Sequence, residues 1–250
     1  MKISVITVTF NSENTIRETI KSVLSQNYKE IEYIVIDGGS KDKTISIIKE
    51  YIDDISYFLT EKDNGMYDAL NKGILASTGE YIGLLHSDDV FMNNSTITEL
   101  ALEMQNLKNY SGTYADLDIV KKDNINIVKR NYSSSYFKPW QLRFGYMFPH
   151  PTLYLHSSVF KKHGLYKTDY RVSADFELIL RLFKNKLKLK RLNIKMIKMR
   201  EGGLSNNGLY WKLHQNFEIV RACRENNVYS NIFLVALKIP FKLIGILNKR

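Results

Sequence analysis

Short apolar runs alternate with segments of helical periodicity along the first ninety residues. Runs rich in β-branched residues at 3–9, 32–37, 55–60 and 81–86 predict four buried strands. Apolar positions three or four apart predict three intervening helices, on Ile16, Ile20, Val23 and Leu24, on Ile45, Ile48 and Ile52, and on Met66, Leu70 and Ile74. Strands that alternate with helices are typical of βαβ units, so we expect an α/β fold with a mostly parallel sheet sandwiched by helices.

The pattern changes after about residue 110. It predicts, in order, a hairpin at 111–130, an irregular and mobile aromatic loop at 131–150, a strand at 151–160, a helix at 174–184, an edge strand at 186–190 and a helix at 210–226. In the helix at 174–184, Leu178, Leu182 and Phe183 are expected to face the core.

The C-terminal segment 229–250 is apolar and basic and contains no acid. Its longest apolar run, Ile232–Leu237, is too short to span a bilayer. On a helical wheel Lys238, Lys242 and Lys249 share one stripe, and Pro240 would kink the helix. Such a helix either lies in a membrane interface or packs on its own domain or a partner. We expect one domain over residues 1–215 and a helical, basic amphipathic tail over 216–250.

Composition narrows the class of protein. The 250 residues are 44% hydrophobic and 12% aromatic, which argues against disorder. Cys223 is the only cysteine, so neither an internal disulfide nor a cysteine-based zinc cluster can form, and a reducing compartment fits. The N-terminus lacks the pattern of a secretory signal, so we expect a cytoplasmic protein.

The net charge of +10 suggests an anionic partner such as a nucleic acid, a phospholipid surface or a nucleotide. Nine lysines and arginines, and no acid, lie between Arg181 and Arg200. The alternative for this block is an ordinary solvated basic face.

Polar side chains follow three of the predicted strands where each strand ends. Thr9 and Asn11 follow the first strand, Asp37 ends the second, and Asp88 and Asp89 follow the fourth. Because ligands bind at the carboxyl ends of parallel strands, we expect these side chains to share one site. Carboxylates there would repel phosphate backbones, which argues against a nucleic-acid-binding protein.

Each motif also has an ordinary structural reading. Asp88 and Asp89 either hold a divalent metal through oxygen ligands or cap a turn. Asp37 either accepts hydrogen bonds from a base or ribose or only shapes the turn with Gly38, Gly39 and Ser40. Neither a GxGxxG fingerprint nor a Walker A sequence is present, so ordinary dinucleotide and phosphate-loop sites are disfavoured.

Three later residues have the same ambiguity. Asp175, at a predicted helix start, is either a general base or a residue that favours the helix N-terminus. His150, at the mouth of a predicted strand, is either structural or part of a site. Trp140 either stacks on a sugar ring or packs locally.

Five segments occur in a fixed order: ISVITVTFN, IDGGSKDKT, EKDNGMYDALNKGI, GEYIGLLHSDDVF and SADFELILRL. Together they resemble the inverting nucleotide-sugar glycosyltransferases of family 2, and residues 201–205 resemble a downstream loop of some members. Three positions depart from the family pattern. Gly38 replaces a second aspartate, His86 stands where many members have an aspartate, and Ala174 stands where many have a glutamate.

The resemblance implies a GT-A fold, a Rossmann-like sheet with residues 1–90 as the nucleotide-sugar-binding half and 91–215 as the acceptor half. It implies donor binding by Thr9, Phe10, Asn11, Asp37, Asp63, Gly65, Asn71, Lys72 and Asp88. The acceptor would contact His150, Trp140 and Glu177, and Asp175 would be the catalytic base. Asp89, with Asp88, would hold Mn²⁺ or Mg²⁺.

The activity that the resemblance implies is inverting transfer of a sugar from a nucleoside diphosphate sugar, with a UDP-sugar as the default donor. The acceptor would be a saccharide or lipid-linked saccharide in bacterial cell-surface polysaccharide synthesis, at the inner face of the cytoplasmic membrane. One alternative is a non-catalytic nucleotide-sugar-binding or scaffold subunit. A nucleotidyltransferase would carry a glycine-rich, lysine-bearing loop where this chain has Thr9–Asn14.

Overall fold

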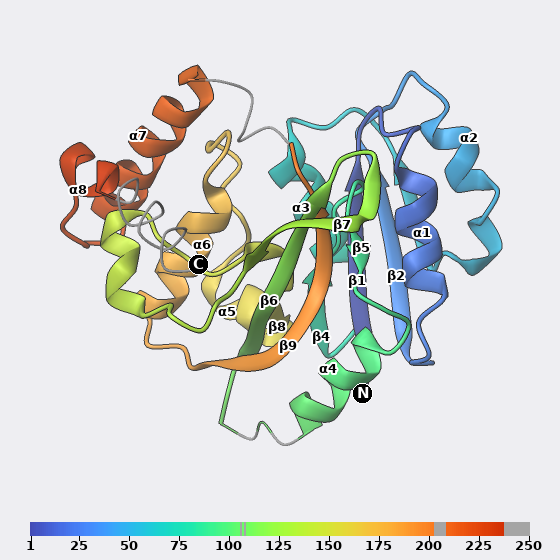
Figure 1. Cartoon of the computed structure of the whole chain (residues 1–250), viewed down its shortest axis with the longest axis horizontal. Helices are drawn as coiled ribbons and strands as arrows, with labels where there is room; N and C mark the ends of the chain where they lie inside the picture. The colour runs from blue at the N-terminus through green and yellow to red at the C-terminus, as the bar shows by residue number, and fades with distance from the viewer. Residues whose placement is uncertain (106, 108, 203–208, 238–250) are drawn as a thin grey trace.

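A computed structural model describes residues 1–105, 107, 109–202 and 209–237 (Figure 1). The strands of this part are β1 (Ile3–Thr9), β2 (Ile31–Asp37), β3 (Tyr57–Thr60), β4 (Tyr81–Leu84), β5 (Val90–Phe91), β6 (Gly112–Lys121), β7 (Asn124–Tyr132), β8 (Tyr154–His156) and β9 (Leu189–Arg200). The α-helices are α1 (Ile16–Leu24), α2 (Thr44–Lys49), α3 (Met66–Ala76), α4 (Thr96–Gln105), α5 (Ser157–His163), α6 (Ala174–Lys184), α7 (Leu209–Glu225) and α8 (Ile232–Ala236). Three 3₁₀ turns are η1 (Ile52–Asp54), η2 (Pro139–Phe144) and η3 (His150–Thr152).

One mixed sheet runs through the described residues in the order β3-β2-β1-β4-β8-β6-β9-β5, and β7 pairs with β6. Strands β1 to β4 are parallel to one another, as expected, and Thr9 at the end of β1 lies opposite Asp37 at the end of β2. The ends of β1, β2 and β4 therefore meet at one edge of the sheet, which we call the rim. The polar strand-end residues predicted from the sequence lie at this edge.

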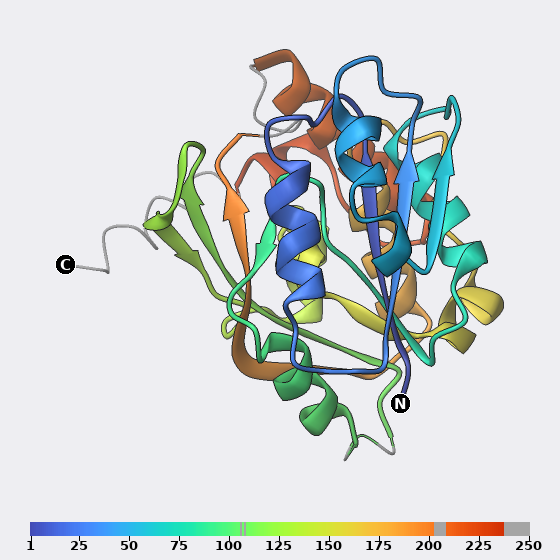
Figure 2. The ribbon, with the colours of Figure 1, turned by 90° about the vertical axis from the view of Figure 1, so that its right-hand side faces the viewer.

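Both faces of the sheet are buried. On one face Ile6, Val8 and Ile36 pack under α3, α6 and α7. On the other face Val5 and Val35 pack under α1, α2 and α4, and Figure 2 shows α1 and α2 lying over this face. Burying one such aliphatic side chain contributes about 1.5–3 kcal/mol, so the two-sided core fixes the strands that carry the rim.

Several predicted elements differ in extent. Helix α2 ends at Lys49, so Ile52 leaves the helix and is 41% exposed. The predicted strand at 151–160 is a short strand, β8, followed by helix α5, whose first turn is capped by the His156 side chain. Strand β9 begins at Leu189 and is twelve residues long. Its outer neighbour β5 pairs only with Ile197 and Lys198, so the first part of β9 is an edge.

The C-terminal half differs from the prediction at one boundary and is anchored in one loop. In the segment 131–150, Phe148 is fully buried and its ring stacks 4.1 Å from that of Tyr114. The mobility predicted for the rest of this segment stays a prediction. The boundary expected between residues 215 and 216 falls inside α7. That helix buries Ile219 and Cys223 in the same cluster as β1, so α7 belongs to the core of the domain.

No helix within the described residues combines the length and apolarity needed to cross a bilayer. The lysine stripe predicted for the tail, Lys238, Lys242 and Lys249, lies outside the described residues, as do Pro240 and most of the loop at 201–205.

Candidate active site

At the end of β1 the backbone is tied to the turn that follows β2. The carbonyl of Thr9 accepts the Gly38 N–H at 2.9 Å. Asn11 has a left-handed backbone, with φ 49°, and its side-chain oxygen accepts the Lys41 N–H at 2.8 Å. Phe10, between them, is 59% exposed. The Thr9 hydroxyl is buried and has no partner among the described residues, which leaves one polar atom at the rim for a ligand or water.

The carboxylate of Asp37 is fully buried and already satisfied. It accepts hydrogen bonds from the N–H groups of Gly39 and Ser40, both at 3.0 Å, and from the hydroxyls of Ser40 and Thr60. Asp37 therefore shapes the turn at the rim. It has no exposed acceptor for a nucleobase in this arrangement, so direct donor contact by Asp37 is not supported.

A second carboxylate covers this turn. A Cβ atom built on Gly38 would lie 2.4 Å from Oδ2 of Asp63, so the Asp63 side chain fills the space beside Gly38. The other oxygen of Asp63 accepts the Gly65 N–H at 2.9 Å. Among the described residues Oδ2 has no hydrogen-bond donor, so it is available at the rim. The position where the family has a second aspartate is thus served by a carboxylate from the connection between β3 and α3.

The other residues expected to bind the donor, in and just before α3, mainly hold this helix in place. Gly65 precedes the helix with φ 112°, a conformation that favours glycine. Asn71 bonds the backbone of Tyr166 in both directions, at 2.8 and 3.0 Å. Lys72 forms ion pairs with Glu61 and Asp68 at 2.7 and 3.3 Å. The side chains of Asn71 and Lys72 therefore have partners within the protein, and their direct contact with a donor stays a prediction.

The two aspartates after β4 differ sharply in environment. Asp89 is 1% exposed, and its Oδ1 accepts the Arg200 N–H at 3.2 Å. Burial, with the neighbouring Asp88 carboxylate, raises the pKa of Asp89 well above its usual range. Asp88 is partly exposed, and its carboxylate has no donor among the described residues. Asp88 is thus the more accessible of the two carboxylates, whereas Asp89 was expected to be the principal metal ligand.

Arg200 is a structural residue that the sequence pattern does not reveal. Its guanidinium donates to the carbonyls of Asp88 and Lys122 and pairs with Glu18. It is only 7% exposed. Arg200 was counted in the basic block, but it fixes the turn after β4 to β9 and α1.

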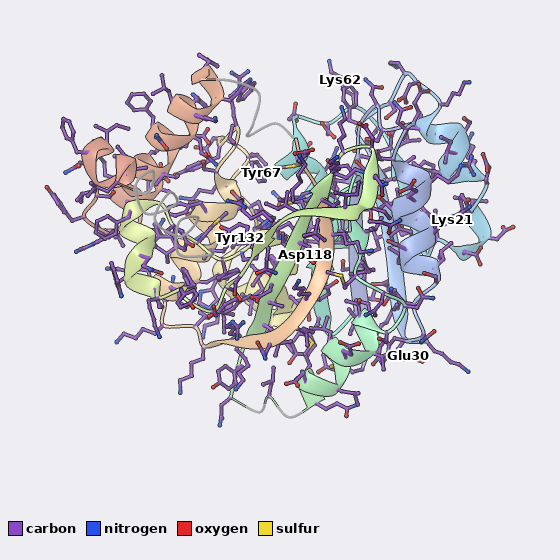
Figure 3. All side chains as sticks on the ribbon, in the orientation of Figure 1. Lys21, Glu30, Lys62, Tyr67, Asp118 and Tyr132 are labelled. Carbon is purple, nitrogen blue, oxygen red and sulfur yellow. The ribbon has the colours of Figure 1, made fainter. Side chains whose placement is uncertain are left out.

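The second half of the site is built around Asp175, in the first turn of α6. Its Oδ1 accepts the Phe176 N–H at 2.8 Å and lies 3.4 Å from the hydroxyl of Tyr67. Burial raises the pKa of Asp175 to about 6, although these hydrogen bonds oppose the rise. Figure 3 labels Tyr67 near the centre of the molecule, between the two halves. A carboxylate with this pKa is mostly ionised at pH 7 and can accept a proton.

Two histidines connect Asp175 to the end of β4. Nδ1 of His150 lies 4.0 Å from Oδ2 of Asp175, and Nε2 of His150 is 3.0 Å from the Tyr166 hydroxyl. Burial lowers the pKa of His150 to about 3, so its ring is neutral at pH 7. The ring of His86, two residues before Asp88, lies 6.1 Å from the ring of His150. The chain His86, His150, Asp175 thus joins the two halves of the site.

Glu177 does not join this cluster. Its carboxylate is fully buried and pairs with Arg181 at 3.0 Å and Lys167 at 3.2 Å. Because no oxygen of Glu177 faces solvent, the expectation that it contacts an acceptor is wrong for this arrangement. Trp140 is also apart from the cluster. It is 64% exposed on η2, and its ring packs against Phe144.

Glu218 of α7 was not predicted, yet it holds the loop before Asp175. Its carboxylate accepts the backbone N–H groups of Arg171, Val172 and Ser173 at 2.7, 2.9 and 2.8 Å. Glu218 is 6% exposed. The sequence shows only an acid within the helix predicted at 210–226, and the fold is needed to show what Glu218 binds.

The fit of a divalent metal depends on Asp88. The described residues contain no group of three or more His, Cys, Asp or Glu placed to hold a metal. Mg²⁺ bound to a nucleotide typically takes one or two carboxylates together with phosphate oxygens and water, rather than a cage of protein ligands. The one partly exposed carboxylate of Asp88 fits that mode.

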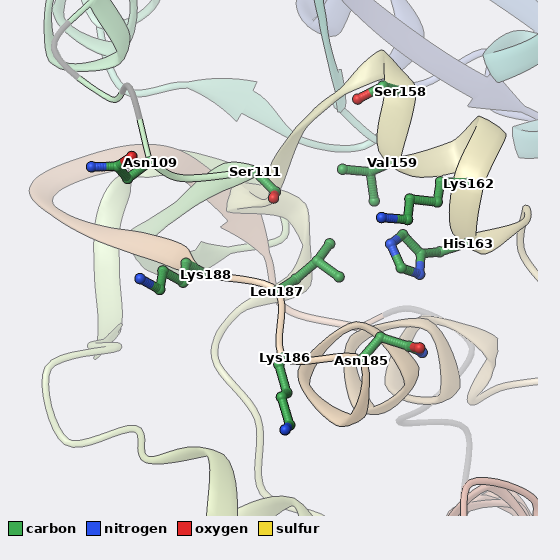
Figure 4. Close-up of a pocket in the computed structure, with 10 residues that line it drawn as sticks. All are labelled: Asn109, Ser111, Ser158, Val159, Lys162, His163, Asn185, Lys186, Leu187 and Lys188. Atoms are coloured by element: carbon green, nitrogen blue, oxygen red, sulfur yellow. The ribbon is translucent and has the colours of Figure 1, made fainter.

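A separate hollow of about 450 Å³ lies away from these residues (Figure 4). Its lining includes Lys162, Lys186, Lys188 and His163 and no acid. It lies where β6 and β9 begin, at the edge of the sheet opposite the rim. It therefore does not belong to the candidate active site.

Comparison with known proteins identifies the class. The profile described as glycosyl transferase family 2 matches residues 4–161. An uncharacterised glycosyltransferase of Mycobacterium tuberculosis is 34% identical over 181 residues, which cover 72% of this chain and 68% of that protein. The chain therefore belongs to glycosyl transferase family 2.

Solved structures share the fold. TarS of S. aureus, residues 1–349 in complex with UDP, superposes with a TM-score of 0.71 at 18% identity, covering 94% of this chain and 70% of that one. The mannosyltransferase PcManGT of Pyrobaculum calidifontis, in complex with GDP-Man and Mn²⁺, gives a TM-score of 0.65 at 16% identity, covering 90% and 63%. The expected GT-A fold is confirmed.

Proposed function

We propose that this glycosyltransferase moves a sugar from a nucleoside diphosphate sugar to an acceptor hydroxyl with inversion at the anomeric carbon. The observation that carries the proposal is the pairing of two unlike carboxylates across the site. Asp88 is partly exposed after β4, and Asp175 is a largely buried base, with a side chain 20% exposed and a pKa raised to about 6. Solved relatives of the fold bind UDP, UDP-GlcNAc or GDP-Man, which supports a nucleotide sugar at the rim.

In this proposal the donor lies along the rim. The nucleobase of the donor faces the turn at Gly38. There Asp63 Oδ2 accepts an N–H of uracil, and the Thr9 hydroxyl supplies a further contact. Asp88 would hold Mn²⁺ or Mg²⁺, whose positive charge would be shared with the diphosphate. Lys62 has no acidic partner among the described residues and is labelled beside the rim in Figure 3, so it is placed to neutralise phosphate where Lys72 is not. We propose a UDP-sugar as the donor.

The bond changes follow from these positions. The acceptor oxygen attacks the anomeric carbon while the bond from that carbon to the phosphate oxygen breaks, and the electron pair leaves with the diphosphate. Asp175 takes the proton of the acceptor hydroxyl. The Phe176 N–H and the Tyr67 hydroxyl hold the Asp175 carboxylate in place. A single displacement assisted by one carboxylate base gives inversion. A bound divalent metal would supply positive charge to the leaving diphosphate.

We further propose that the acceptor is a saccharide or lipid-linked saccharide used in bacterial cell-surface polysaccharide synthesis, and that the enzyme works at the inner face of the cytoplasmic membrane. His150, beside Asp175, is the proposed acceptor contact, and Glu177 is not.

Calorimetric titration with UDP, GDP and dTDP, each with and without Mn²⁺, tests the donor site. We expect one nucleotide to bind tightly only when Mn²⁺ is present. In Asp88→Asn the gain in affinity from Mn²⁺ should be lost. The matched control, Asp54→Asn, alters an exposed acid of η1 away from the rim and is expected to leave binding unchanged. If no nucleotide bound under any condition, the proposed donor site would be wrong.

A further inference from the structure

Three elements meet at one end of the molecule. Figure 1 shows α7, α8 and the yellow-green segment that contains η2 together on the side away from β1 to β3. A Cβ atom built on Gly145, directly after η2, would lie 3.1 Å from Ile219 of α7 and 3.3 Å from Val235 of α8. The Ser230 hydroxyl also donates to the carbonyl of Arg143 at 2.6 Å. These contacts pack the three elements against one another.

This end of the molecule carries much exposed apolar area. Of the sixteen large hydrophobic side chains that are exposed among the described residues, eight lie on segments 136–144 and 210–237. They are Tyr136, Trp140, Tyr210, Leu213, Phe217, Tyr229, Phe233 and Leu237. Single exposed hydrophobics are ordinary, but a concentration on adjoining elements marks an interaction surface.

Helix α7 is apolar on two opposite sides. Ile219, Ala222 and Cys223 on one side are buried in the core. Tyr210, Leu213 and Phe217, spaced three and four residues apart, share the other side and are 66%, 48% and 62% exposed. A helix that only served the core would need a single apolar stripe, so the second stripe indicates contact with something outside the described residues.

The unpaired charges around this surface have one sign, because the exposed Asp169 beside Phe217 pairs with Arg221. Lys138 and Arg143 flank or belong to η2, Lys212 and Arg224 belong to α7, and all four are exposed without an acidic partner among the described residues. Neither η2 nor α8 contains an acid. On α7, Glu218 is buried against backbone N–H groups, and Glu225 pairs with Lys167 and Arg221. The surface therefore presents aromatic groups and cations without a free carboxylate.

We propose that this η2–α7–α8 surface, formed by Trp140, Tyr210, Leu213, Phe217 and Phe233 with the four cations, docks on an anionic lipid bilayer. Aromatic and aliphatic side chains enter the interface of a bilayer, and lysines and arginines attract its anionic headgroups. The combination of exposed apolar stripes with unpaired cations fits that partner in both respects.

The strongly basic segment 181–200 fits a bilayer less well. Arg181 pairs with Glu177, Arg191 with Asp116, Lys195 with Asp118 and Arg200 with Glu18. Four of its nine cations are thus paired with acids of the same chain. The lysine-lined hollow of Figure 4 also contains some of the block, but it offers few apolar groups to a bilayer.

The docking surface is next to the candidate base. The outer side of α7 carries Leu213 and Phe217, and its inner side carries Glu218, which holds the loop before Asp175. Docking of α7 would therefore place the acceptor side of the active site at the bilayer, where a lipid-anchored acceptor is found. This last step rests on the proposed function; bilayer binding itself does not.

The test is flotation of the full chain with vesicles of phosphatidylcholine alone or mixed with phosphatidylglycerol. We expect salt-sensitive binding to the mixed vesicles that falls about tenfold or more when Leu213, Phe217 and Phe233 are each replaced by Ser. The matched control replaces Leu75 and Leu102 by Ser. These residues are 73% and 57% exposed on α3 and α4, and their replacement should leave binding unchanged.

A second variant tests the cations without touching the apolar side chains, and thermal unfolding checks that it is folded. Lys212→Glu with Arg224→Glu changes only exposed charges and should weaken binding to the anionic vesicles while thermal unfolding stays the same. The proposal is overturned if the wild-type protein does not bind the mixed vesicles. It is also overturned if the control variant loses binding as much as the variant of Leu213, Phe217 and Phe233. A dimer in sedimentation that dissociates in the serine variant without any vesicle binding overturns it as well. Nucleotide titration of the same variants separates this outcome from failure of the donor site, since both variants should bind nucleotide normally.

Discussion

Nδ1 of His150 lies 4.0 Å from Oδ2 of Asp175, and the two side chains stay in different charge states at neutral pH. Burial lowers the pKa of His150 to about 3 and raises that of Asp175 to about 6. The neutral ring beside an ionised carboxylate leaves the base free of a competing cation. This relationship decides how the site should respond to pH.

The rate of sugar transfer should fall as pH drops through about 6, the raised pKa of Asp175. Only the ionised carboxylate accepts a proton, so the rate should decline about tenfold per pH unit below that value. His150 should add no inflection between pH 5 and 8, because its pKa is lowered to about 3. A pH profile of kcat checks this. A rate independent of pH down to pH 4 would contradict the assignment of the base.

Asp175→Asn should make the protein more stable at pH 7. The carboxylate is protonated in both states below its ordinary pKa of 3.8, ionises first in the unfolded state, and ionises in the folded state at about 6. The ionised carboxylate therefore lowers the free energy of unfolding as pH rises from 3.8 to about 6. The total loss is about 3 kcal/mol at most. Asparagine keeps an oxygen for the Phe176 N–H. Urea unfolding at pH 7 should show a gain that shrinks toward pH 4, and equal stabilities at both pH values would refute the raised pKa.

Gly38→Ala should weaken nucleotide binding without unfolding the protein. The new methyl group would lie 2.4 Å from Asp63 Oδ2 and displace that carboxylate. Hydrogen bonds to charged groups contribute about 1.5–3 kcal/mol, so we expect a loss of about 10- to 100-fold in affinity. The comparison is made in an Asp63→Ala background, where Gly38→Ala should cost little more. Additive losses in the double variant would mean that the two residues act separately.

The first half of the fold is predictable from sequence because its signals are local. The β-branched runs and helical stripes of residues 1–90 place β1 to β4 and α1 to α3, and the parallel order brings the strand ends to one rim. The helix predicted at 174–184 has the observed bounds, Ala174–Lys184. Family membership adds the GT-A fold, which the solved structures support.

The sequence does not show which carboxylates are already engaged. Asp37 and Asp89 look as available as Asp88, yet Asp37 accepts hydrogen bonds from the turn after β2, and one oxygen of Asp89 accepts the Arg200 N–H. The partner of Asp89 is 111 residues away along the chain, so no spacing rule predicts the contact. The covering of Gly38 by Asp63 depends in the same way on how the connection after β3 folds back.

Secondary-structure prediction fails where an apolar segment fits both a strand and a helix. Residues 151–160 are apolar enough for one strand, but only Tyr154–His156 pair in the sheet before α5 begins. The mobility predicted for 131–150 from its irregular spacing stays a prediction. Irregular segments can still be anchored by single buried rings, and Phe148 does so here.

Glu218→Gln should lower kcat more than it lowers nucleotide affinity. The glutamate accepts three backbone N–H groups in the loop before Asp175, and the loss of its charge should cost about 2–3 kcal/mol of stability. The loop would then hold the base less firmly. Glu225→Gln is the control on the same helix, because its partners Lys167 and Arg221 are exposed. Equal effects of the two variants on kcat would remove the positioning role.

Sugar transfer by Asp175→Asn, measured with nucleotide affinity on the same preparation, tests the central claim most directly. A general base typically contributes about 10²–10⁴-fold. The account predicts a loss of that size in transfer with Mn²⁺-dependent nucleotide binding unchanged. Near-normal transfer by Asp175→Asn would contradict the account.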